Sequence, residues 1–184
     1  MVNKRKYSGF TLLELLVVIS LVAMLIGILV PSLKKAKALT KSTVCKSNLR
    51  AAAVGFRMYL DEYDDYMPPA ARYPSLGINN LKPIAEFLRP FLSGPKSLRC
   101  PADSRHMRDD SDRNYFETED SSYEYNQDIG GQRVKNTFFS KDLGFSERDI
   151  QVIYDYASFH KKKGKPGAVN YLYADGHVGD KTKQ

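Results

Sequence analysis

The sequence predicts an α+β protein in which one long N-terminal helix packs on a small antiparallel sheet with long loops. An apolar run at residues 10–30 is followed by an apolar stripe with helical spacing that reaches Tyr63. The C-terminal part is rich in β-prone residues and carries a hairpin signal at Asp175-Gly176. A chain of 184 residues has room for this helix and one small head.

Composition excludes several classes of protein. Lys and Arg number 28 and Asp and Glu 21, which gives a net charge of +7, and 42% of residues are hydrophobic. These values exclude a polytopic membrane protein and a chain that is disordered throughout. Two cysteines exclude a disulfide-dense scaffold.

The apolar run is long enough to cross a membrane. A helix over residues 10–30 spans about 31 Å, which matches a bilayer core of roughly 30 Å. A secretory signal peptide has a shorter run and then a small-residue cleavage site, where this chain has Pro31 and Leu33. A plain membrane anchor leaves Glu14 unexplained, because a carboxylate in hydrocarbon is rarely kept without a partner.

The segment Gly9-Phe10-Thr11-Leu12-Leu13-Glu14, preceded by a short basic leader, resembles the type IV prepilin cleavage motif. The resemblance implies that a membrane peptidase cuts between Gly9 and Phe10 and methylates the new amine of Phe10. It also implies that Glu14 offsets the positive N-terminus of a neighbouring subunit, an attraction that is strong in a low-dielectric medium. Pro31 matches a helix-kinking proline common in such proteins.

This resemblance implies four segments: a leader at 1–9, a transmembrane and assembly helix at 10–30, an amphipathic continuation at 31–62 and a head at 63–184. The protein would be a single-pass protein of the inner membrane, with its head on the outer side. The positive-inside rule alone favours the opposite orientation, because more basic residues follow the span than precede it: Lys34, Lys35, Lys37, Lys41, Lys46 and Arg50. The orientation therefore rests on the resemblance, which keeps the leader in the cytoplasm.

The helix is expected to continue to about residues 61–65, before Met67-Pro68-Pro69. Its buried stripe would be Cys45, Leu49, Ala52, Phe56, Tyr59 and Tyr63. In the head, a short helix is expected at 82–91, and the acidic segment 103–128 is expected to be a surface loop. Strands are expected within 149–159 and 169–178, the second bent by a type I′ turn at Asp175-Gly176.

The C-terminal segment resembles a prepilin-associated motif in which a histidine precedes an Asp-Gly pair. Here the histidine is His160 and the pair is Asp175-Gly176, with His177 after it. Fourteen residues separate His160 from Asp175, more than is usual in that motif, so a shared role for His160 stays open.

Two candidate sites involve cysteine and histidine. Cys45 and Cys100 would form a disulfide on the oxidising side of the membrane, or would stay two buried thiols. His160, Asp175 and His177, with Asp155 nearby, are metal-ligand types, although their spacing matches no metal motif.

Two charged segments could bind Ca²⁺ or nucleic-acid phosphate, or could simply be solvent-exposed surface. The acidic segment 103–128 offers oxygen ligands for Ca²⁺, as a head loop does in the major pseudopilin of type II secretion, but it lacks EF-hand spacing. The lysines of Lys161–Lys165 suit phosphate, yet no aromatic platform accompanies them, so nucleic acid is not an expected partner. No cofactor is required, and no catalytic motif is present in the sequence.

The expected function is that of a pilin-like subunit, or pseudopilin, of a type II secretion system or a related type IV filament. Its partners would be a prepilin peptidase, other pilin-like subunits, the inner membrane and the secretion or pilus machinery. A minor pilin for adhesion or DNA uptake is an alternative, and a membrane-tethered metal-dependent enzyme is a more remote one.

Overall fold

The computed structural model describes residues 10–103, 112–161 and 163–180. The chain divides into two compact units, residues 1–38 and 39–184, and helix α1 (Leu12–Glu62) contributes to both. The predicted helix end near residues 61–65 is confirmed, because α1 ends at Glu62 and Asp64 and Asp65 then adopt positive φ.

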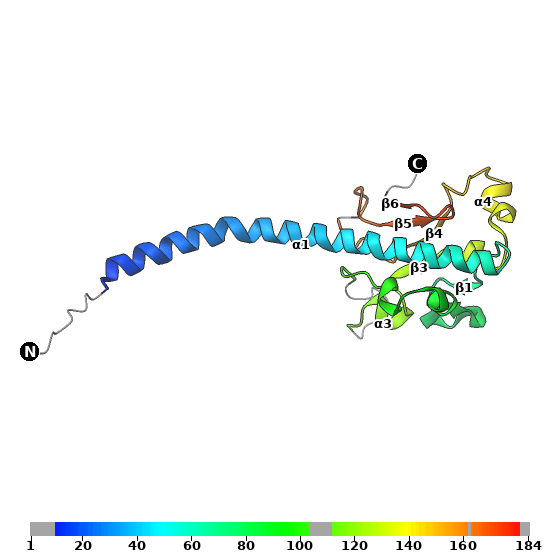
Figure 1. The fold of residues 1–184 in the computed structure, drawn as a ribbon, viewed down its shortest axis with the longest axis horizontal. Helices are drawn as coiled ribbons and strands as arrows, with labels where there is room; N and C mark the ends of the chain where they lie inside the picture. The colour runs from blue at the N-terminus through cyan, green and yellow to red at the C-terminus, as the bar shows by residue number, and fades with distance from the viewer. Residues whose placement is uncertain (1–9, 104–111, 162, 181–184) are drawn as a thin grey trace, which may run out of the picture. The chain divides into compact units, whose positions relative to one another are not determined.

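The head contains short helices and short strands (Figure 1). The α-helices are α2 (Ile84–Leu88), α3 (Tyr115–Glu119) and α4 (Phe138–Lys141). Turns of 3₁₀-helix cover Pro74–Leu76, Ile78–Asn80, Arg89–Phe91, Pro95–Leu98, Gln127–Ile129 and Val134–Asn136. The helix predicted at 82–91 is thus α2 followed by one 3₁₀ turn, because Pro90 cannot donate the next helical hydrogen bond.

The main sheet is antiparallel and has the order β3-β4-β5-β6. Its strands are β3 (Tyr123–Tyr125), β4 (Gln151–Asp155), β5 (Tyr171–Tyr173) and β6 (Val178–Gly179). A separate parallel pair joins β1 (Ala70–Ala71) to β2 (Lys82–Pro83). One long helix with a small antiparallel sheet is the predicted α+β architecture, which is confirmed.

The apolar stripe of α1 forms one side of the head's core. Cys45, Leu49, Ala52 and Phe56 are buried, together with Tyr59, as the helical spacing predicts. Tyr63, the last predicted member of the stripe, is instead 49% exposed. It lies one residue beyond the helix end and stacks on Tyr59, with 4.3 Å between the ring centroids.

The acidic segment is not a single surface loop, so that prediction is wrong over its described part. It contains α3 and β3, and all three residues of β3 are buried. β3 pairs with β4 in the register Tyr123↔Asp155, which carries the segment into the sheet. Residues 104–111 of the segment lie outside the described residues.

The C-terminal hairpin forms where predicted, but its turn is one residue longer than a type I′ turn. Tyr173 N–H donates to His177 O, and Gly176 N–H donates to Tyr173 O. The loop is therefore Ala174-Asp175-Gly176, and only Gly176 has positive φ, at 89°. A three-residue loop with a left-handed glycine last is the next most common hairpin after the two-residue kind.

Candidate functional site

The N-terminus of α1 is closed by a capping box. The Thr11 hydroxyl accepts a hydrogen bond from Glu14 N–H at 3.2 Å, and the Glu14 carboxylate accepts from Thr11 N–H at 2.9 Å and from the Thr11 hydroxyl at 2.8 Å. This reciprocal pattern satisfies donors that a helix start leaves unpaired. The spacing Thr-x-x-Glu is visible in the sequence, so the role of Thr11 was open to prediction and was missed.

The helix that follows presents apolar side chains on all sides. The large apolar residues from Leu12 to Leu33 are all exposed within this chain, and this stretch is apolar enough to cross a membrane. Its serines are satisfied internally: Ser20 Oγ donates to Val17 O at 2.8 Å and Ser32 Oγ donates to Ile28 O at 3.4 Å. Glu14 is the only charged residue between Phe10 and Leu33. Such a surface suits lipid or a bundle of like helices.

The three other predicted N-terminal residues are Pro31, Gly9 and Phe10. Pro31 lies inside α1 and has no N–H to donate to the carbonyl of Gly27, so the helix lacks one hydrogen bond there. Gly9 lies outside the described residues, and Phe10 is the first residue described. Processing at Gly9 and Phe10 stays a prediction.

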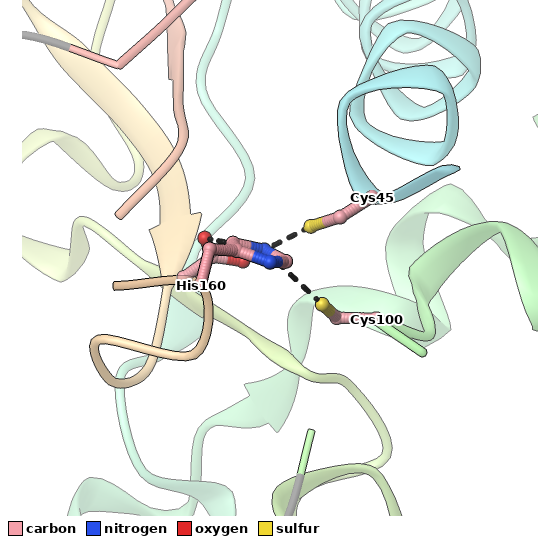
Figure 2. A group of neighbouring side chains, drawn as sticks. Cys45, Cys100 and His160 are labelled. Carbon is pink, nitrogen blue, oxygen red and sulfur yellow. Dashed lines mark hydrogen bonds and ion pairs between the residues drawn. The ribbon is translucent and has the colours of Figure 1, made fainter. Parts of the chain in front are cut away.

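A second group of chemically active side chains lies inside the head. The ligand atoms of Cys45, Cys100, Asp155 and His160 all lie within 4.8 Å of one another. Figure 2 shows the two sulfur atoms pointing toward the His160 ring from α1 and from the segment that follows the Pro95–Leu98 turn. We call these four residues the Cys-Asp-His cluster.

Regular structure positions two members of the cluster. Cys45 belongs to the buried stripe of α1. Asp155 ends β4 and shares a strand face with Ile153, because side chains two apart in a strand point the same way. His160 is held by its backbone N–H, which donates to Ala168 O at 3.5 Å. The cluster therefore joins α1, β4 and two loops.

Short contacts connect the cluster. Cys45 Sγ lies 3.2 Å from Asp155 Oδ1, Cys100 Sγ lies 3.5 Å from His160 Nε2, and His160 Nε2 lies 3.5 Å from Asp155 Oδ2. The side chains of His160 and Asp155 are 1% and 0% exposed. Cys45 and Cys100 are equally buried. Water is thus excluded from all four groups.

Burial and mutual contact alter the acidity of the cluster. The adjacent Cys45 thiol, assisted by His160, lowers the pKa of Cys100 to about 5 against the opposing effect of burial. The same contact with Cys100, followed by burial and the charge of Asp155, raises the pKa of Cys45. Burial and then the charge of Cys100 raise the pKa of Asp155 to about 7, in spite of hydrogen bonds from Asn170.

A shell of donors surrounds the cluster. Asn170 donates to Asp155 Oδ2 through its backbone N–H at 2.7 Å and through its side-chain amide at 3.0 Å, and the amide also lies 3.5 Å from Cys45 Sγ. The Tyr123 hydroxyl lies 3.3 Å from Cys45 Sγ. These groups stabilise negative charge on sulfur and oxygen in a dry site.

The structure does not gather His160, Asp175 and His177 into one ligand set, which corrects that prediction. Among the described residues, the only group of three or more metal-ligating side chains is the Cys-Asp-His cluster, which includes His160 alone of the three. His177 instead pairs with Asp175 in the hairpin loop, where Asp175 Oδ1 lies 2.6 Å from His177 Nδ1 and accepts from His177 N–H at 3.0 Å. Sequence reasoning missed the whole cluster because Cys45 and Cys100 are distant along the chain from Asp155 and His160.

The two cysteines lie close together, as the disulfide prediction requires, but both are free thiols in this structure. The disulfide therefore stays a prediction.

Calcium binding by the acidic segment also stays a prediction. Its described acids contact separate partners: Glu119 accepts from Ser75, Asp120 from Arg89, and Glu124 from Tyr154.

Comparison with known proteins connects the N-terminal features to one family of filament proteins. Residues 4–30 match the family described as the prokaryotic N-terminal methylation motif. The chain is also 36% identical over 76 residues to the type IV wide pilus major component PilA4 of Thermus thermophilus. That match covers 41% of this chain and 58% of the relative, which is less than two thirds of the relative's length. No solved structure matches the chain significantly.

The methylation motif coincides with the basic leader, the capping box and the exposed apolar helix. The relative is named as a structural component of a pilus and not as an enzyme. In the motif, the apolar helix and this likeness together, the chain is similar to type IV pilin-like proteins.

Proposed function

We propose that this protein is a structural subunit of a type IV filament or of a type II secretion pseudopilus, processed after Gly9 and methylated at Phe10. One observation carries the proposal: the methylation motif includes an exposed apolar helical segment that bears a single carboxylate, Glu14. Burying each large apolar side chain contributes roughly 1.5–3 kcal/mol. The helix therefore has a strong drive to enter lipid or a bundle of like helices.

The proposed life of the subunit has two stages. Before assembly, the apolar helix anchors the chain in the inner membrane as a single span, with the head on the outer side. A prepilin peptidase then frees the amine of Phe10, and the helix moves from lipid into a filament of other pilin-like subunits. The Glu14 carboxylate would form an ion pair with the N-terminal ammonium group of a neighbouring copy. Two opposite charges cost less free energy as a pair than separately in a low-dielectric medium.

The likeness to a pilus major component supports a pilus in preference to a secretion pseudopilus. A deletion strain separates the two: loss of surface filaments with normal protein secretion supports the pilus, and the reverse result supports secretion.

Processing provides the direct test. Gly9→Ala should leave most of the protein as precursor, because a Cβ is added at the residue on which the peptidase acts. Intact-mass measurement on membranes from the native host should show wild-type protein that begins at Phe10 with one added methyl group, and G9A protein that keeps residues 1–9.

Ser8→Ala is the matched control, since it changes one small leader residue beside the cut and should be processed normally. Wild-type protein that still begins at Met1 in a host with an active prepilin peptidase would refute the proposal. Normal shortening and methylation of G9A would refute the assignment of the cut.

A further inference from the structure

We propose that the Cys-Asp-His cluster is a structural zinc site, which ties helix α1 to the sheet of the head. The inference concerns the folded head alone and does not rest on the proposed function. Zinc in proteins takes thiolate, imidazole and carboxylate ligands, and structural sites are four-coordinate and closed to water. Cys45, Cys100, His160 and Asp155 supply one atom of a suitable type each.

The spacing of the four atoms suits a tetrahedral ion. Zinc bonds of about 2.0–2.3 Å imply ligand-to-ligand separations of roughly 3.3–3.8 Å in a tetrahedron. The observed contacts are 3.2 Å from Cys45 to Asp155 Oδ1, 3.5 Å from Cys100 to His160 and 3.5 Å from His160 to Asp155 Oδ2, and one ligand atom of each residue lies within 4.8 Å of the others. Small movements of the side chains would bring one Asp155 oxygen and the other three ligand atoms to tetrahedral distances from an ion.

The burial of the cluster favours a metal over an empty polar core. A carboxylate, an imidazole and two thiols are costly to hold in a dry interior unless their charges are compensated. Here all four side chains are almost fully buried. A divalent cation compensates two thiolates and one carboxylate to a single net negative charge, and the donors of Tyr123 and Asn170 face that charge.

The geometry favours zinc over a Cys45–Cys100 disulfide. Besides their contact with each other, Cys45 lies against Asp155 and Cys100 lies against His160. A disulfide would engage the sulfurs with each other and leave Asp155 and His160 with only each other as partners within the cluster. The Nδ1 atom of His160 is buried and has no hydrogen-bond partner within the described part of the chain, so the polar contacts of the ring lie on its Nε2 side, toward the cluster.

The bound ion would cross-link segments far apart in sequence. Its ligands come from α1, from the loop after Leu98, from β4 and from the loop after β4. Both thiols release their protons when they bind, so zinc affinity should fall in acid, and binding should contribute directly to the stability of the head.

The test uses the full chain, purified in detergent with a reductant, then exposed to zinc and freed of excess metal. Elemental analysis should find one zinc per chain. Removal by a chelator should lower the melting temperature of the head, and added zinc should restore it. Cobalt in place of zinc should give sulfur-to-cobalt charge-transfer bands and the visible bands of a tetrahedral ion.

His160→Ala and Cys100→Ser should weaken zinc binding at least about tenfold and remove or shift the cobalt bands. His177→Ala is the matched control, because His177 pairs with Asp175 on the surface, and it should bind zinc as wild type does. Substoichiometric zinc in the reduced wild-type chain would overturn the proposal. So would wild-type zinc affinity in H160A, or a native protein whose two thiols are joined and metal-free.

Discussion

His160 and His177 show how strongly surroundings decide what one residue type does. His160 is sealed from water beside two thiols and a carboxylate. His177 is 46% exposed at its side chain, pairs with Asp175 and stacks on Tyr173 with 4.2 Å between ring centroids. The sequence places both near the Asp-Gly turn, but only the first has the neighbours that a metal ligand needs.

The Asp175–His177 pair should stabilise the hairpin in a pH-dependent way. Partial burial opposes ionisation of Asp175, but hydrogen bonds from His177 and the nearby Arg148 outweigh it and lower the pKa of Asp175. A carboxyl group with a lowered folded-state pKa contributes stability above its unfolded pKa of about 3.9 and loses it as pH falls through the folded value.

Asp175→Asn tests this pair, because asparagine keeps the turn-forming side chain and removes the charge. The variant should be less stable than wild type by about 0.3–1 kcal/mol at pH 7, a small value since the pair is solvent-screened. The gap should shrink below about pH 4. Thermal unfolding of wild type and D175N at pH 7 and pH 3 measures this difference in stability, with Asp142→Asn as a control at an exposed acid. A gap that widens in acid would contradict the stated sign.

At the scale of elements, the packing of α1 on the head depends on Gly55. A Cβ at this position would lie 2.8 Å from Leu92 Cδ2 and 3.2 Å from Phe91 O. The absence of a side chain lets the 3₁₀ turn Arg89–Phe91 and Leu92 approach the helix closely. Tyr59, one helical turn later, fills the adjoining space with edge contacts to Phe87 and Phe91.

Gly55→Val should therefore destabilise the head by about 1–3 kcal/mol, since overpacking forces side chains or backbone to shift. Ala51→Val is the matched control, because Ala51 is exposed one turn earlier on the same helix. It should cost less than about 0.7 kcal/mol, the propensity difference of a β-branched residue. Thermal unfolding of both full-length variants measures the difference in stability. Equal melting temperatures would show that the head has room for a side chain at position 55 beside Leu92 and Phe91.

The same scale shows what the sequence could predict and what it could not. The helical spacing from Cys45 to Tyr59 predicted the buried stripe, because local periodicity alone decides which residues share a helix face. Strand β3 was missed because Glu124 and the acids before it hide the short apolar pattern of Tyr123 and Tyr125. Glu124 is tolerated there because Arg72 lies 3.1 Å from it, a partner from a distant segment.

The Cys-Asp-His cluster was beyond sequence reasoning for a related cause. The sequence groups Cys45 with Cys100, and His160 with Asp175 and His177 with Asp155 nearby, and of these groupings the structure keeps the two cysteines together and His160 beside Asp155. Only the sheet register, which sets Asp155 opposite Tyr123, and the packing of α1 bring the four together. The spacing of these four residues along the chain does not predict that all four lie together.

At the scale of the whole molecule, the two units bury apolar surface in different ways. The head, within residues 39–184, has its own buried core. The large apolar side chains of Leu12–Leu33 have no core to join within this chain and remain exposed. Lipid or other molecules could bury them, so in the proposed function the N-terminal unit is the part that drives assembly.

Glu14 should then control assembly more than anchoring. Its carboxylate is satisfied by Thr11 in the single chain, but a carboxylate placed in hydrocarbon costs about 2.5–3.5 kcal/mol. Glu14→Leu should therefore stay in the membrane at least as firmly as wild type and yet enter filaments poorly, because the neighbouring ammonium loses its partner.

Glu14→Gln separates the charge from the capping box, since glutamine can replace glutamate in that box. If the charge is what assembly uses, E14Q should fail to enter filaments as E14L does, with at least tenfold less subunit in sheared filaments, about the effect of 1.4 kcal/mol. Membrane fractions and sheared filaments, compared by immunoblot, measure both steps. Normal incorporation of E14Q with loss of E14L would show that Glu14 acts by capping its own helix and would remove the role of a charge between subunits.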